Sequence, residues 1–109
     1  MDLDKFYGCL RRLYEEIGKK VECLENDAGK GFSEMDGLLK NLAGLLPDWF
    51  FFIEQTGIGT KDQILSVLQD MEAAVIAEDT VLLADTLLYG LQKMAGDYMR
   101  IIEEAVYEG

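Results

Sequence analysis

Side chains able to do acid–base or metal chemistry are of few kinds in this sequence. The chain has 21 acidic residues, two cysteines and no histidine. It therefore lacks both the commonest general base and the commonest metal ligand. A di-iron site in a helical bundle would need Glu-x-x-His pairs, which cannot exist here. We therefore expect no catalytic, cofactor-binding or metal-binding residue, and we predict that the protein is not an enzyme.

The two cysteines do not change that expectation. Cys9 and Cys23 lie two heptads apart on one predicted helix, roughly 20 Å at a rise of 1.5 Å per residue, which is too far for a disulfide. Two distant thiols cannot complete a zinc site, and no imidazole is present to activate either one. Unpaired cysteines are typical of a reducing compartment, and acidic residues at positions 2 and 4 stand where a secretory leader would be basic and then apolar. We expect a cytoplasmic protein.

Carboxylates alone leave one chemical alternative open, a calcium or magnesium site. The segment 25–29 is acidic, but it lacks the alternating ligands and closing glutamate of an EF-hand loop. Glu103 and Glu104 are adjacent on a predicted helix and so face different directions. A solvated acidic face is the simpler interpretation, and carboxylate-based metal binding stays an alternative.

The net charge limits the choice of partners. It is −11, and the acidic residues are spread along the whole chain. Such a surface repels phosphate backbones and anionic membranes, so we expect neither a nucleic-acid nor a membrane partner. No apolar run approaches the ~18 residues of a membrane span. Half of the 109 residues are hydrophobic, which suits one domain spanning residues 1–109.

The aromatic stretch 45–53 organises the predicted fold. Its apolar residues recur at helical spacing and place one set of side chains on a common face: Leu38, Leu42, Leu45, Trp49, Phe52 and Ile53. We predict a helix from about Ser33, as its N-cap, to Gln55, with Trp49 buried. Pro47 falls on the polar side and removes a backbone hydrogen bond, so we expect this second helix to be kinked or broken near Pro47.

Three further segments have helical patterns, and nothing in the chain is typical of a strand. Residues 3–26 carry apolar residues at heptad spacing, followed by a loop over residues 26–31. Thr60 and Gln63 form a capping box before a third helix, whose buried residues we predict to be Ile64, Val67, Leu68, Met71 and Val75. A fourth helix spans about 81–107. Short links between four amphipathic helices predict an all-α fold, an antiparallel up-down four-helix bundle.

Several apolar side chains fall outside the predicted core faces. They are Phe50, Phe51, Leu82, Tyr89 and Tyr107. A contiguous patch of such residues would mark an interface, and we take these five as the candidate protein-interaction residues. An acidic rim would favour a basic amphipathic partner helix, as in a small chaperone or adaptor. The alternative is that the same residues lie at the centre of a structural homodimer.

Three runs carry a resemblance to a known family: Phe32 to Leu39, Leu45 to Trp49, and Ala77 to Tyr89. With them the chain resembles a bacterial family of small uncharacterised acidic all-helical proteins. The resemblance implies an all-helical fold and no established activity. Some of these proteins are similar in size and charge to flagellar export chaperones, which by class analogy agrees with a protein-binding role.

Overall fold

In the computed structural model, which describes residues 2–107, the chain is helical and has no strand. This confirms the all-α prediction. None of the described helices is both long enough and apolar enough to cross a bilayer. The elements are α1 (Leu3–Asn26), α2 (Ala28–Ser33), α3 (Met35–Thr56), α4 (Lys61–Ile76), α5 (Thr80–Asp85), the π-helical segment η1 (Thr86–Gln92) and α6 (Lys93–Tyr107).

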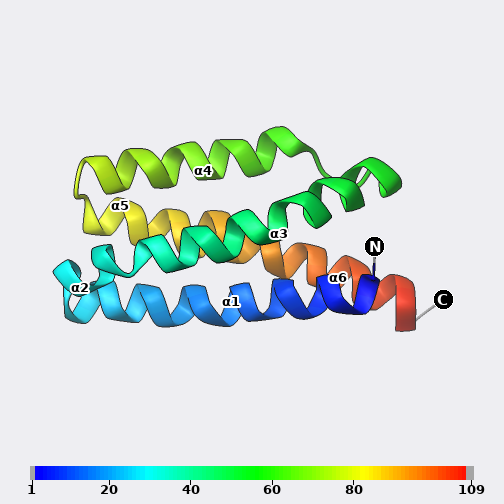
Figure 1. The fold of residues 1–109 in the computed structure, drawn as a ribbon, viewed down its shortest axis with the longest axis horizontal. Helices are drawn as coiled ribbons and strands as arrows, with labels where there is room; N and C mark the ends of the chain where they lie inside the picture. Colours follow the sequence, from blue (N-terminus) through cyan, green and yellow to red (C-terminus); the bar gives the residue numbers. More distant parts are fainter. Residues whose placement is uncertain (1, 108–109) are drawn as a thin grey trace.

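These elements form four rods. The first is α1, the second is α2 with α3, the third is α4, and the fourth is the continuous run of α5, η1 and α6. Successive rods run in alternate directions along the long axis (Figure 1). The molecule is elongated, with principal extents of 44 × 23 × 20 Å.

The second rod differs from its prediction in where it begins and in where it bends. The predicted loop over residues 26–31 is wrong, because Asp27 accepts a hydrogen bond from the Lys30 amide at 3.2 Å and starts α2 at Ala28. Ser33 lies inside α2 and is no N-cap; its hydroxyl donates to the Lys30 carbonyl. The bend of this rod is at Glu34. Pro47 lies within α3, and the kink expected there is not confirmed.

The third rod begins at the cap that the sequence predicts, and the fourth rod also begins at a side-chain cap. Thr60 accepts from the Gln63 amide at 3.3 Å, as the capping box predicts. Asp79 accepts from the Leu82 amide at 3.0 Å and starts the fourth rod. The turn between these rods holds Glu78 at a φ of 53°, a left-handed conformation that costs a residue with a Cβ about 1–2 kcal/mol.

An aromatic cluster joins three of the rods. The Trp49 ring is fully buried and meets Tyr98 of α6 edge-on, with ring centroids 5.3 Å apart. Phe52 lies 5.9 Å from Tyr98 and 5.3 Å from Phe6 of α1. The indole is therefore the inward anchor that its position on the apolar face predicts.

Helix α1 and the fourth rod each bury a continuous stripe of apolar side chains. In α1 the buried residues are Phe6, Leu10, Leu13, Ile17, Val21 and Leu24, close to the predicted heptad seam. In the fourth rod the buried residues are Leu83, Ala84, Leu87, Leu91, Ala95, Tyr98 and Ile102. From Ala84 to Ile102 they recur every three or four residues, the spacing that keeps one helical face toward the core.

The third rod stands apart from the second. Across the described residues, α4 has its close backbone neighbours in α5 and η1, whereas those of α3 are α1 and α2. Ile64 and Met71 of α4 are buried as predicted, but Val67, Leu68 and Val75 are only half-buried. The prediction that all five are buried is wrong for these three. Leu68 and Val75 face the space between α3 and α4, which α3 does not close, and Val67 lines a hollow between α4 and η1.

Candidate protein-binding groove

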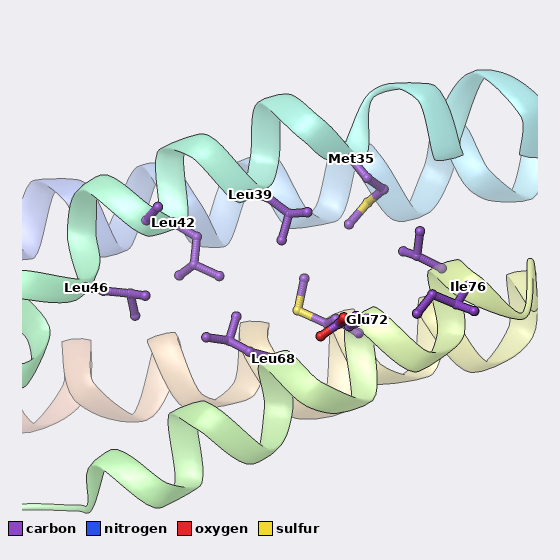
Figure 2. A pocket seen from close by; sticks show the side chains of 10 residues that line it. Met35, Leu39, Leu42, Leu46, Leu68, Glu72 and Ile76 are labelled. Carbon is purple, nitrogen blue, oxygen red and sulfur yellow. The ribbon is translucent and has the colours of Figure 1, made fainter.

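A groove runs between α3 and α4, with a volume of about 410 Å³. Its α3 wall consists of Met35, Leu39, Leu42, Ala43 and Leu46. Its α4 wall consists of Leu68, Met71, Glu72, Val75 and Ile76. Figure 2 shows side chains of both helices projecting into the space between them. Nine of these ten residues are apolar, so the groove offers hydrophobic surface with one charged group in it.

The groove exposes residues that a closed core would cover. Leu39 is 39% exposed and Ile76 is 75% exposed, whereas Met35 and Met71 at the base are 2% and 1% exposed. Apolar area left in water costs roughly 25 cal/mol per Å². An apolar groove with a buried base and exposed edges is therefore a surface that gains free energy when another apolar element covers it.

Local sequence explains why α3 has two apolar faces. One face carries Trp49 and its neighbours into the aromatic cluster. Residues 35, 39, 42, 43 and 46 recur every three or four positions and form the second face. Sequence reasoning placed Leu42 on the face with Trp49 and missed the other members of this stripe, because it assigned a single apolar face to the helix. The signal was the recurrence of Leu39 and Leu46 one heptad apart.

Glu72 is the charged residue of the groove. It lies on α4 between Leu68 and Ile76, one turn from each (Figure 2). Its side chain is exposed, and within the described part of the chain no residue forms an ion pair or hydrogen bond with it. Water alone therefore solvates this carboxylate when the groove is open.

The sequence-predicted interaction residues lie outside this groove. Phe50 is half-buried, and the Lys61 ammonium sits over its ring at 5.6 Å from the centroid while pairing with Glu54. Phe51 is 44% exposed near the end of α3. The phenylalanines thus differ, since one is covered by a cation and the other faces water.

The second predicted stripe lies on the fourth rod. Leu82 is 44% exposed and Tyr89 is 73% exposed. Tyr107 is in α6, but its side chain lies outside the described residues. Helix α5 and the end of α3 are at opposite ends of the long axis (Figure 1), so Leu82 and Phe51 are not brought together. Tyr89 instead borders a polar hollow against α4, with Asp62, Ser66 and Lys93.

A third hollow, of about 400 Å³, lies between α1 and α3 and contains Cys9. The Arg12 guanidinium donates to the Cys9 sulfur at 3.2 Å. The carboxylate of Glu16 accepts from the Asn41 amide at 3.0 Å, so it is held by α3. Arginine is too basic to accept a proton from a thiol, and this arrangement supplies no general base to Cys9.

Cys23 has an environment that keeps its thiol protonated. Burial raises the pKa of Cys23, and the neighbouring Glu34 carboxylate raises it further. The Lys20 ammonium, 3.2 Å from Glu34, lowers the pKa of that carboxyl, with a smaller contribution from Cys23. Both cysteines are free. In the described residues, no group of three or more cysteine, aspartate and glutamate side chains could hold a metal ion.

Comparison with models of known protein families, with curated proteins and with solved structures finds no match to this chain. The groove, with its apolar walls and its one carboxylate, is therefore the feature from which we infer a function.

Proposed function

We propose that this chain is a non-enzymatic, chaperone- or adaptor-like protein that binds an amphipathic helix of a partner protein in the α3–α4 groove. The observation that carries the proposal is an apolar groove with a buried base and exposed edges. In this proposal the four rods are an antiparallel up-down four-helix bundle in which the third and second rods leave room for an added helix. The two free cysteines support a cytoplasmic location.

The dimensions of the groove support a helical occupant. From Met35 to Leu46 the α3 wall spans roughly 16 Å at 1.5 Å per residue, which is about three helical turns. A helix that fits such a groove presents apolar anchors at i, i+3, i+4 and i+7. The occupant thus needs an apolar stripe of about three turns and a polar outer face.

Charge supports a basic occupant over a second copy of this chain. Helices α3 and α4 each carry three acidic residues and one lysine, so both helices that flank the groove are net negative. A second copy would bring a further charge of −11 against the same surface. Complementary potentials raise association rates and suppress like-charged partners, so we assign the groove to a helix whose outer face carries lysine or arginine.

The proposal is tested with a synthetic helical peptide of about 16 residues, a length at which isolated helices begin to be stable. The probe carries leucine on one face, lysine on the other and a fluorophore for anisotropy. Substituting Leu39→Glu in the groove should weaken binding at least tenfold. Leu82→Glu is the matched control, because it makes the same change at a similarly exposed leucine outside the groove, and it should leave binding within twofold.

Two results overturn the proposal. One is that the wild-type protein does not bind the peptide at micromolar concentration. The other is that Leu82→Glu reduces binding as much as Leu39→Glu does. Sedimentation velocity gives an independent outcome, since a dimer dissociated by Leu39→Glu would assign the groove to a second copy of the chain.

A further inference from the structure

Glu72 presents a physical problem to any helix that fills the groove. Its carboxylate lies among apolar side chains of the α4 wall, and its side chain is exposed. A docked helix would remove water from at least one side of this carboxylate. An ionised carboxylate that loses water without gaining a partner is destabilised, and this loss opposes the gain from burying the apolar walls.

The partner can remove this cost by bringing a cation to the same place. We propose, on the basis of the function proposed above, that the bound helix carries a lysine or arginine within its apolar face, where it pairs with Glu72. This differs from a basic outer face, because the cation stands between two apolar anchors. Glu72 is then the specificity-determining residue of the groove, and a helix with this cation in its apolar face binds more tightly than one whose apolar face is leucine alone.

The spacing on α4 sets the pattern expected in the partner. Leu68 precedes Glu72 by four residues and Ile76 follows it by four, about 6 Å in each direction along the helix. A helix lying along α4 therefore places an apolar residue three or four positions to each side of its basic residue. A long side chain suits this position, since its methylene stem packs on the apolar wall while its charged end reaches the carboxylate.

The experiment is a charge-swap cycle with two peptides. Both have the leucine anchors and lysine outer face described above, and they differ in the central residue of the apolar face, which is lysine in one and glutamate in the other. Wild-type protein should prefer the lysine peptide by about tenfold, as close charge pairs at interfaces do. Glu72→Lys should reverse the preference, and Glu72→Gln should reduce it to within twofold.

A matched control separates this pair from the general field of an acidic protein. Asp70→Lys makes the same charge change at an exposed residue of α4 that does not line the groove, and it should leave the preference for the lysine peptide in place. Equal binding of both peptides by the wild type, or equal effects of the Asp70 and Glu72 substitutions, would overturn the role of Glu72. The proposed groove would survive that result if Leu39→Glu still abolished binding. If neither peptide binds, the groove function itself is wrong.

Discussion

The hydroxyl of Tyr98 donates a hydrogen bond to the backbone carbonyl of Ile58, with 3.1 Å between the two oxygens. This bond ties the loop between α3 and α4 to α6, and the same tyrosine ring packs edge-on against Trp49. One side chain therefore fixes both the aromatic cluster and the start of the rod that forms one wall of the groove.

The close approach at this loop predicts a large effect of Gly59→Ala. A Cβ at Gly59 would lie 1.9 Å from the Tyr98 hydroxyl oxygen, and the residue has a φ of 77°. Gly57 is the matched control, since its φ is 68° but a Cβ there meets nothing within 4 Å. Each alanine substitution should lower the free energy of unfolding by about 1–2 kcal/mol, because alanine disfavours the left-handed backbone. Gly59→Ala should lose a further 1–3 kcal/mol, roughly, through displacement of Tyr98, as urea unfolding would measure. Equal losses would contradict the Tyr98 contact.

A second glycine pair tests the junction of α1 and α2. A Cβ at Gly31 would lie 2.9 Å from the Leu24 Cα, which is backbone and cannot move aside. A Cβ at Gly37 meets nothing within 4 Å. Gly37→Ala should therefore stabilise the protein by about 0.5–1 kcal/mol through helix propensity, whereas Gly31→Ala should destabilise it. Thermal unfolding of the two variants gives shifts of opposite sign if the two helices meet as described.

The turn at Glu78 predicts a stabilising substitution. Its φ of 53° suits glycine better than glutamate, so Glu78→Gly should raise the free energy of unfolding by about 0.5–1 kcal/mol. Ala77, with a φ of −76°, is right-handed, and Ala77→Gly should be destabilising. The two melting temperatures, measured side by side, check the assignment. A loss of stability in Glu78→Gly would mean that the turn is not left-handed.

The Lys20–Glu34 pair predicts a pH dependence with a definite sign. The folded-state pKa of Glu34 is lowered, chiefly by its hydrogen bond with Lys20. The pair therefore stabilises the fold above the ordinary pKa of glutamate, about 4.3, and the contribution is lost as pH falls through the lowered folded value. Glu34→Gln should make the free energy of unfolding fall less steeply in acid. Urea unfolding at a series of pH values from about 6 downward measures this dependence. In a Lys20→Gln background, Glu34→Gln should have a smaller effect on how the free energy of unfolding depends on pH.

Burial of the indole predicts the cost of removing it. Trp49 has no exposed surface, and Trp49→Ala should lower the free energy of unfolding by about 3–5 kcal/mol. The indole Nε1 is buried without a hydrogen-bond partner of normal geometry. Trp49→Phe removes that unsatisfied donor and keeps a ring in the cluster, so its loss should be clearly smaller. A loss below ~1 kcal/mol for Trp49→Ala would mean that the ring does not anchor the core.

The buried faces of α1 and α3 could be predicted from sequence, because periodicity alone identifies which residues of one helix point the same way. The spacing around Trp49 placed it inward, and the Thr60 cap follows from a side chain next to the bond it makes. The helix over residues 28–33 was not predicted from the sequence, since Gly29 and Gly31 favour a loop by composition. Packing of Gly31 on Leu24, together with the Asp27 cap, overrides that preference.

The candidate groove depends on how α3 and α4 lie relative to each other. The periodicity of a single helix carries no information about that. Sequence alone determined an all-helical chain with an acidic surface, a buried tryptophan and no histidine. Only the tertiary structure decided that α4 packs on α5 and η1 without closing on α3, and so that Leu39, Leu68 and Ile76 line an open groove. The physical reason is that periodicity tells which residues avoid water, whereas the distance between two rods depends on how all the side chains between them pack.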